Sequence, residues 1–294
     1  MSFAAYYLGC PIWACEKWAG NLYTRNAKRE DWLRQYSRVF NTVEGNSTFY
    51  GLPSADTVQR WADSVGSGFR FALKFPRSIS HDKRLLNAEP ETDAFLQILR
   101  TLRRADRLGP AFLQMPSGVS GHHLGDLERY LRQLPREFPY AVELRHTDFF
   151  GCGQTEQALN QLLAELHIDR VILDSRPLFS APASDPYESK SQERKPRLPV
   201  RPVVTANSPV IRLIGRDEIR RVTPWIQEWS RTVAKWINSG MTPFIFTHTP
   251  DELYAPQLAR QFHLELIKHT DHVGDLPRWP GEQELLAGRQ LELF

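Results

Sequence analysis

The chain has 294 residues, of which 41% are hydrophobic and 24% charged, a composition that excludes global disorder and favours a globular protein with a sizeable core. Its 37 basic and 34 acidic residues leave a net charge of +3. This balance does not by itself indicate a protein that binds nucleic acid through its overall charge, so any anion binding must be local. No apolar stretch approaches the roughly 18 residues of a membrane span and no signal-peptide pattern opens the chain, so we predict a cytoplasmic protein without a membrane partner.

Eight strand patterns alternate with helical patterns along the chain. The strands are expected at 6–9, 40–44, 69–74, 111–115, 140–145, 170–174, 210–214 and 244–248. The helices are expected near 29–39, 54–65, 91–103, 124–134, 154–167, 224–238 and 255–269, with Ser54 as a capping residue. This alternation indicates a parallel sheet, and eight strands close a (β/α)8 TIM-type barrel. We therefore predict an α/β fold in which residues 1–294 form a single barrel domain.

A doubly wound open sheet is the alternative architecture. Such a sheet carries three glycines in the phosphate-binding loop after its first strand, in the pattern G-x-G-x-x-G. Here Gly9 is followed by Cys-Pro-Ile-Trp, so the loop holds one glycine. The barrel is favoured for this reason.

Two segments depart from the alternation. Residues 177–209 are rich in proline and basic residues and have no sustained apolar period, so we predict a long loop after the sixth strand. Loops of this length are either lids over a barrel mouth or surface excursions, and the sequence leaves both open. Residues 270–294 are polar and contain proline, so a peripheral tail is expected there.

Charged and polar side chains fall on the predicted inner face of the strands. In the third strand Phe71 and Leu73 suit the helix side, which leaves Lys74 inside. The same alternation gives an inward set at the carboxyl ends of the strands, where barrel active sites are built: Glu44, Lys74, Gln114, Glu143, Arg145, Asp174, Arg212 and His248. A layer of structural ion pairs is the alternative explanation, above all for Glu143 and Arg212.

Several motifs along the chain resemble the YecE-like, DUF72 family of (β/α)8-barrel proteins, whose activity is not established. The resemblance runs from Tyr7 to about Phe262. It rests on Phe-Asn-Thr-Val-Glu-Gly-Asn-Ser-Thr-Phe-Tyr at 40–50, Phe-Arg-Phe-Ala-Leu-Lys-Phe-Pro at 69–76, Leu-Gln-Met-Pro at 113–116, Val-Glu-Leu-Arg-His at 142–146 and Ala-Pro at 255–256. Many members have Arg-Leu-His-Gly in the seventh strand and an Asn pair after the eighth, where this chain has Ile214 and His248-Thr249. The resemblance implies the barrel and names no reaction.

The favoured function is an enzyme, a hydrolase or isomerase, that acts on a small, polar, anionic substrate of phosphorylated or sugar-like character. Carboxylate acid/base chemistry at the mouth requires a pair of acids in different environments. The candidate catalytic residues are Glu44, Glu143 and Asp174. The candidate substrate-binding residues are Asn46, Tyr50, Lys74, Gln114, Arg145, Arg212, His248 and Trp13, of which the cations would clamp the anion and the aromatic rings would stack on a sugar or base ring or simply pack the rim.

A metal-dependent phosphoesterase or nuclease-like enzyme is the second interpretation. His81 and His248 with the inward carboxylates would have to supply the ligands. The histidines lack HExxH-type spacing, and the three cysteines, Cys10, Cys15 and Cys152, lack the paired clusters of a zinc site. No cofactor is therefore predicted, although a divalent metal stays an alternative.

The third interpretation is a barrel that binds an anion or a nucleic-acid phosphate without catalysis. Gly215-Arg216 and Thr247-His248-Thr249 follow the seventh and eighth strands, whose loops commonly hold phosphate in barrels. A small anionic molecule is the favoured partner and nucleic acid the less favoured one, and the oligomeric state is not specified by the sequence.

Overall fold

The computed structural model describes residues 5–291. Its strands are β1 (Tyr7–Gly9), β2 (Thr42–Gly45), β3 (Arg70–Leu73), β4 (Ala111–Gln114), β5 (Tyr140–Glu143), β6 (Asp169–Asp174), β7 (Val210–Ile214) and β8 (Phe244–His248). Its α-helices are α1 (Arg29–Tyr36), α2 (Ser47–Tyr50), α3 (Ala55–Asp63), α4 (Glu89–Arg104), α5 (Leu124–Gln133), α6 (Gln154–Glu165), α7 (Pro186–Arg194), α8 (Thr223–Asn238), α9 (Ala255–Leu266) and α10 (Pro280–Leu291). Shorter helical turns are η1 (Glu16–Trp18), η2 (Ser78–Asp82), η3 (Gly121–His123), η4 (Thr147–Phe149), η5 (Ile219–Val222) and η6 (Glu252–Tyr254).

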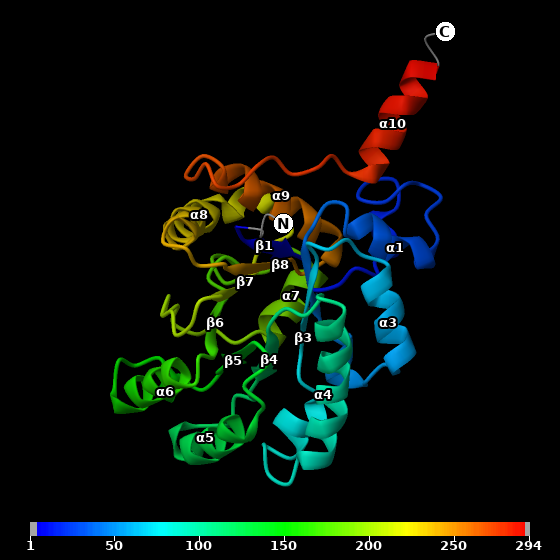
Figure 1. Ribbon diagram of the computed structural model, residues 1–294. Coiled ribbons are helices and arrows are strands. Elements are labelled where there is room, and N and C mark those ends of the chain that lie inside the picture. Colours follow the sequence, from blue (N-terminus) through cyan, green and yellow to red (C-terminus); the bar gives the residue numbers. More distant parts are fainter. Residues whose placement is uncertain (1–4, 292–294) are drawn as a thin grey trace.

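All strand pairs in the described chain are parallel, as the alternation predicted. Six strands form a curled sheet in the order β1-β8-β7-β6-β5-β4, and β2 and β3 form a separate pair. The strands are thus assigned to two sheets and not to one continuous eight-stranded sheet. Figure 1 looks along the strands: their labels surround α7, and α3, α4, α5, α6, α8 and α9 lie outside them. The arrangement is that of an α/β fold with its helices on the outer face.

The inner face of the strands is apolar at its base. Eight buried side chains from seven strands form one inner cluster: Tyr7, Ala72, Phe112, Ala141, Val171, Val210, Phe244 and Phe246. Their neighbours in sequence, such as Phe71 and Val142, belong instead to the larger core between strands and helices. This period-two division of side chains is the one the sequence predicted for β3 and β5.

Local sequence signals explain where the helices begin. Ser54 caps α3, because its hydroxyl accepts a hydrogen bond from the Thr57 N–H at 3.3 Å. Helix α4 has a proline in its first turn, acidic residues at its start and basic ones at its end, all of which favour a helix in that direction. These two helices were predicted within two residues of their observed starts.

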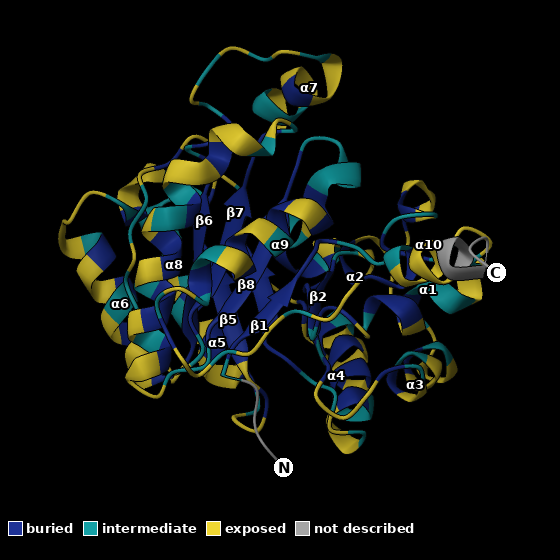
Figure 2. Cartoon of the chain, turned by 90° about the horizontal axis from the view of Figure 1, so that it is seen from above, coloured by how far each residue is buried: buried dark blue, intermediate teal, exposed yellow. Residues whose placement is uncertain are grey.

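Residues 177–209, predicted as a long loop after the sixth strand, contain the helix α7. Asp185 caps this helix through a 2.9 Å hydrogen bond from the Glu188 N–H. Glu188 is fully buried and pairs with Arg216, which also donates to the carbonyl oxygens of Ala181 and Pro182, each at 2.9 Å. A buried ion pair therefore holds α7 in place. Because the helix is not held by an apolar face, its sequence has no apolar periodicity from which it could be predicted. Figure 2 shows α7 beyond the ends of β6 and β7.

Replacing Arg216 by methionine is expected to release α7 without unfolding the rest of the chain. The variant leaves Glu188 buried without its cation, a state that local opening relieves. Trypsin should then cleave after Lys190 or Arg194 about tenfold faster or more than in the unaltered protein. Arg231→Met, at an exposed arginine of α8, is the matched control. Equal cleavage rates in the two variants would contradict the anchoring role.

The segment 270–294 was predicted as a peripheral tail, and its described part carries α10. Trp279 is only 1% exposed and anchors the start of this helix. Gly281, in the first turn of α10, also packs against the body of the protein. A side chain added at this glycine would lie only 2.3 Å from the Asn21 carbonyl oxygen. The helix then projects from the body of the molecule (Figure 1). Over the described residues, none of the helices has the length and apolar character needed to cross a membrane.

Candidate functional site

Two fully buried carboxylates share one arginine at the carboxyl ends of the strands. Arg212 of β7 donates from Nε and Nη2 to the two oxygens of Glu44 in β2, each at 2.8 Å. Its Nη1 donates to Glu143 Oε2 of β5 at 2.6 Å. The three side chains come from well-separated strands, so the ion pairs tie the inner face together above the apolar cluster.

The charge state of these carboxylates follows from two opposing effects. Burial alone raises a carboxyl pKa, but Arg212 and then His248 more than offset it and hold the pKa of Glu44 well below its usual range. For Glu143 burial is likewise overcome by Arg212, Arg145 and Lys74, and the pKa falls to about 2. Both groups are ionised at neutral pH, and neither is suited to act as an acid there.

A second branch of the network surrounds Gln114. Its Oε1 accepts hydrogen bonds from Lys74 Nζ at 2.8 Å and from Arg145 Nη2 at 2.7 Å, and Arg145 Nε donates to Glu143 Oε1 at 2.7 Å. The buried Thr48 hydroxyl donates to the Lys74 carbonyl oxygen at 2.6 Å, which fixes the end of β3. The sequence prediction therefore placed Lys74, Gln114, Glu143 and Arg145 correctly on one inner face.

Lys74 has an unusual environment for an ammonium group. It is 6% exposed, and its Nζ lies 3.9 Å from the centroid of the Phe49 ring. Burial and then the nearby Arg212 lower its pKa to about 7, against the opposing pull of Glu143 and Glu44. Lys74 therefore exchanges its proton near neutral pH.

Asn46 and His248 complete the surroundings of Glu44. Asn46 Nδ2 donates to Glu44 Oε1 at 2.7 Å, and His248 Nε2 lies 3.0 Å from Glu44 Oε2. Burial lowers the pKa of His248 to about 4, although Glu44 opposes that shift. A neutral imidazole with its hydrogen on Nε2 then donates to the carboxylate. We name the set Glu44, Asn46, Lys74, Gln114, Glu143, Arg145, Arg212 and His248 the charged cluster.

Asp174 is not part of the charged cluster, so its predicted inward orientation is wrong. Val171 lies in the inner apolar cluster, and side chains alternate along β6, so Asp174 faces outward. Its carboxylate accepts hydrogen bonds from Trp229 Nε1 of α8 at 2.8 Å and from Arg176 Nη2 at 2.7 Å. The sequence prediction assigned the wrong face to Asp174, because Val171, Ile172 and Leu173 form an unbroken apolar run that gives no alternation to read.

A cavity of about 610 Å³ lies above the charged cluster, and we call it the mouth cavity. Four predicted cluster members with cationic or amide groups, Lys74, Gln114, Arg145 and Arg212, line it together with Asn46, His248 and the 82% exposed Tyr50. Sequence reasoning missed four further cations of its wall: Arg77, Lys190, Arg194 and Lys195. The last three belong to α7 and the residue after it, and the basic character of 177–209 was the available signal.

Glu252 of η6 is a second residue that the sequence did not single out. It lines the mouth cavity, and its Oε2 atom is buried without a hydrogen-bond partner. Burial raises its pKa to about 8, with Lys195 opposing the shift and Glu44 adding to it. At neutral pH it is therefore a neutral carboxyl in the wall of the cavity.

Trp13 does not line the mouth cavity. It lines a smaller cavity of about 330 Å³ beside the mouth, and Trp61 of α3 lines the same space. The centroids of the two rings are 5.1 Å apart and their planes meet at 77°. Pro11, Ile12 and Asn46 line both cavities, so the two spaces adjoin. We call the smaller one the side pocket.

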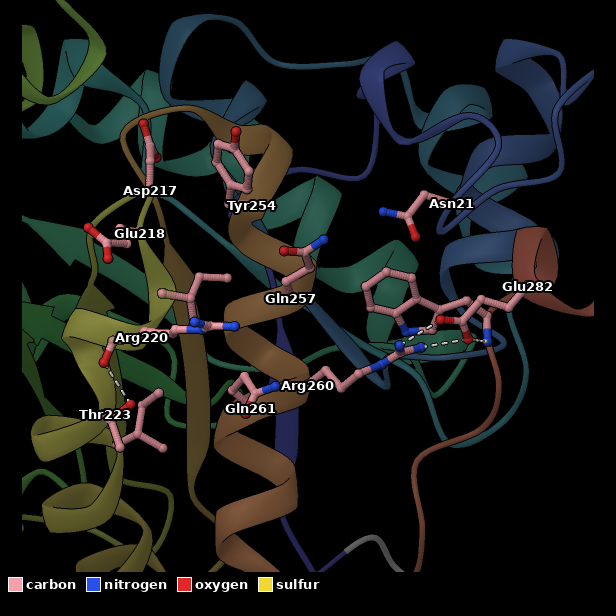
Figure 3. A pocket seen from close by; sticks show the side chains of 13 residues that line it. Asn21, Asp217, Glu218, Arg220, Thr223, Tyr254, Gln257, Arg260, Gln261 and Glu282 are labelled. Atoms are coloured by element: carbon pink, nitrogen blue, oxygen red, sulfur yellow. Dashed lines mark hydrogen bonds and ion pairs between the residues drawn. The ribbon is translucent and has the colours of Figure 1, made fainter. Parts of the chain in front are cut away.

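A third cavity, about 690 Å³, lies away from the charged cluster between the start of α8, α9 and the start of α10 (Figure 3). Arg260 spans it, paired with Glu282 at 2.6 Å and stacked 3.6 Å from the centroid of Trp279. None of the site residues predicted from the sequence lines this cavity. It is a groove between helices, and the contacts of Arg260 hold α10 to α9.

Several groups that a phosphate-binding loop or a metal site would use make other contacts in the structure. The Gly215 N–H donates to the His248 carbonyl oxygen at 2.7 Å, and Arg216 is committed to the α7 anchor, so neither is free to hold a phosphate. Within residues 5–291, no three His, Cys, Asp or Glu side chains gather as a metal-binding group. His81 instead bonds to Ser80 at 2.8 Å, and burial, Lys74 and Arg145 lower its pKa to about 4.

Comparison with known proteins bears out the family resemblance. The family model described as "Protein of unknown function DUF72" matches residues 7–284. The UPF0759 protein YecE of Escherichia coli (strain K12) is 38% identical over 279 residues, which cover 95% of this chain and 99% of that protein. The UPF0759 protein YunF of Bacillus subtilis (strain 168) is 23% identical over 165 residues, or 54% of this chain.

Solved structures show the same fold. A DUF72 family protein from Enterococcus faecalis V583 superimposes with a TM-score of 0.67 at 18% identity, over 89% of this chain and 95% of that one. A DUF72 family protein from Thermotoga maritima MSB8 gives a TM-score of 0.63 at 21% identity, over 89% of this chain and 99% of that one. With a family match over nearly its whole length and a close relative of the same extent, this chain belongs to the DUF72 family.

Proposed function

We propose that the protein is an enzyme acting on a small anionic substrate, phosphorylated or sugar-like, that binds in the mouth cavity. The observation that carries this proposal is the charge of the cavity wall. Among the described residues, the cationic side chains that line it are Lys74, Arg77, Arg145, Lys190, Arg194, Lys195 and Arg212, against one carboxyl, that of Glu252. Even when the underlying Glu44 and Glu143 are counted, the cations remain in excess, and an anion relieves their mutual repulsion.

Proton transfer in this proposal is assigned to Lys74 and not to a pair of carboxylates. Glu44 and Glu143 were the acid and base candidates of the sequence, but both are bound by Arg212 and hold low pKa values. Lys74 lines the cavity and has a pKa near 7, and so meets the requirement that a catalytic acid or base titrate near the working pH. The two carboxylates serve to orient Arg212 and Arg145. Isomerisation by proton abstraction and hydrolysis by an activated water both include a proton transfer of the kind that Lys74 can perform.

The proposal includes closure of the two sheets into one (β/α)8 barrel. Bridges between Phe71 and Leu108 and between Lys74 and Phe112 link β3 to β4. The Glu44 N–H donates to the Cys10 carbonyl oxygen at 3.1 Å, which links β2 to the chain just after β1. These contacts support a closed cylinder whose carboxyl-end mouth is the usual position of a barrel active site.

Anion binding by the mouth cavity is tested by calorimetric titration with inorganic phosphate. We expect saturable binding by the unaltered protein, and a loss of about tenfold or more in affinity for Lys74→Met and for Arg145→Met, because each removes a charge-assisted hydrogen bond. Lys235→Met, at an exposed lysine of α8, is the control and should bind as the unaltered protein does. The proposal fails if phosphate does not bind, or if all three variants retain the original affinity.

A further inference from the structure

The side pocket has the features of a site for a planar ring. Trp13 and Trp61 stand at 77° to each other and are both partly exposed, although indole rings of this size are normally well covered. Phe71 lies behind both, at 6.1 Å from each ring centroid, and holds them in place. The two indoles therefore make a rigid corner, in which a flat ligand can stack on one ring while its edge meets the other.

The composition of the side pocket contrasts with that of the mouth cavity. Apolar residues form most of its wall, together with a few polar groups from Arg29, Glu44, Asn46 and Ser47, and its volume is about 330 Å³. A mainly apolar wall with a few placed polar groups is the usual form of a small-molecule site. The mouth cavity beside it is lined by cations. One ligand that fills both must carry an anionic group at one end and a planar ring at the other.

The two spaces meet at residues that touch the charged cluster. Pro11, Ile12 and Asn46 line both, and Asn46 donates to Glu44 at 2.7 Å and to the Pro11 carbonyl oxygen at 3.1 Å. Glu44 lines the side pocket, while its partner Arg212 lines the mouth cavity. The passage between the cavities is thus built from buried, hydrogen-bonded groups, which position a ligand that crosses it.

We propose that the substrate belongs to the class of nucleoside phosphates, with its phosphate among the cations of the mouth cavity and its base against Trp13 and Trp61 in the side pocket. This inference rests on the proposed function, because it assumes that the mouth cavity holds the anion. Stacking on an indole adds affinity for any base, since every base presents a flat π-face. The side-chain oxygen of Asn46, whose Nδ2 group is held by Glu44 and by the Pro11 carbonyl oxygen, would then accept a hydrogen bond from the base edge or the sugar.

The test compares four probes by calorimetry: inorganic phosphate, ribose 5-phosphate, adenosine 5′-monophosphate and adenosine. The monophosphate is expected to bind about tenfold or more tightly than ribose 5-phosphate, because it alone combines the stacking ring with the anion. Equal affinities for these two would overturn the inference and leave the proposed function intact. Absence of binding by both, and by inorganic phosphate, would overturn the proposed function itself.

Variants of the corner separate stacking from anion binding. Trp61→Leu should reduce the affinity for adenosine 5′-monophosphate to that for ribose 5-phosphate, with the latter unchanged, and Trp61→Phe should fall between. Trp236→Leu, at a partly buried tryptophan of α8, is the matched control for loss of an indole elsewhere. Thermal unfolding of each variant checks that the fold persists. If Trp61→Leu and Trp61→Phe both fold and bind the monophosphate with undiminished affinity, the side pocket does not hold the base.

Discussion

Replacing Arg212 by methionine is expected to destabilise the protein by about 3–5 kcal/mol, because removal of one member of a buried charge network leaves its partners uncompensated. Glu44 and Glu143 are both fully buried and both bound to this guanidinium, so the loss should lie at the upper end of that range. Urea unfolding followed by circular dichroism measures it. The exposed Arg231→Met control should change stability by about 0.5 kcal/mol or less.

The destabilisation caused by unpaired carboxylates can be separated from that caused by lost packing of the Arg212 side chain. A triple variant, Glu44→Gln, Glu143→Gln and Arg212→Met, removes all three charges together, and it should recover most of the stability lost by Arg212→Met alone. Recovery would show that the penalty comes from unpaired carboxylates. A triple variant as unstable as the single one would instead mean that the guanidinium contributes through its packing, for example against Phe112, whose ring centroid lies 5.7 Å away.

Sulfate binding should weaken as the pH rises from 6 to 9, by about tenfold or more. The sign follows from Lys74: its pKa is lowered to about 7, so the free protein loses this ammonium near neutral pH. A bound dianion favours the ammonium, and the affinity therefore falls as pH rises above 7. Lys195, whose pKa is lowered to about 8 by burial and by Arg212, and Glu252, whose carboxyl ionises near 8, change the charge in the same direction.

Sulfate is the appropriate probe because its own charge is constant over this range, whereas that of phosphate is not. Lys74→Met should abolish the step near pH 7 and retain the later one near 8. An affinity that is constant or increases between pH 6 and 9 in the unaltered protein would contradict the role assigned to Lys74.

Sequence analysis located residues correctly in the strands where apolar and polar side chains alternate. Phe71 and Leu73 on one side of β3 left Lys74 on the other, and the same alternation placed Glu143 beyond Ala141. In β6 the residues Val171, Ile172 and Leu173 are apolar one after another, so apolar character does not distinguish the two faces, and Asp174 was misplaced. Periodicity therefore predicts orientation only where apolar and polar side chains alternate along the strand.

The mouth cavity was only partly predictable for a different reason. Lys190, Arg194 and Lys195 reach it because α7 lies over the strand ends, and the helix is held there by the buried pair of Glu188 and Arg216. Two charged residues 28 positions apart give no periodic signal. Glu252 was missed because its burial depends on packing of η6 against the mouth, which no local pattern encodes.

The apolar cluster below the charged residues makes the mouth cavity a blind chamber. Tyr7, Phe112 and Phe246 fill the interior beneath it, as in the packed cores of closed α/β cylinders, so no passage runs through to the other end. On the proposed function, substrate enters and product leaves at this one end of the strands. A product that keeps its anionic group would then occupy the place of the next substrate, so the proposed function predicts competitive product inhibition.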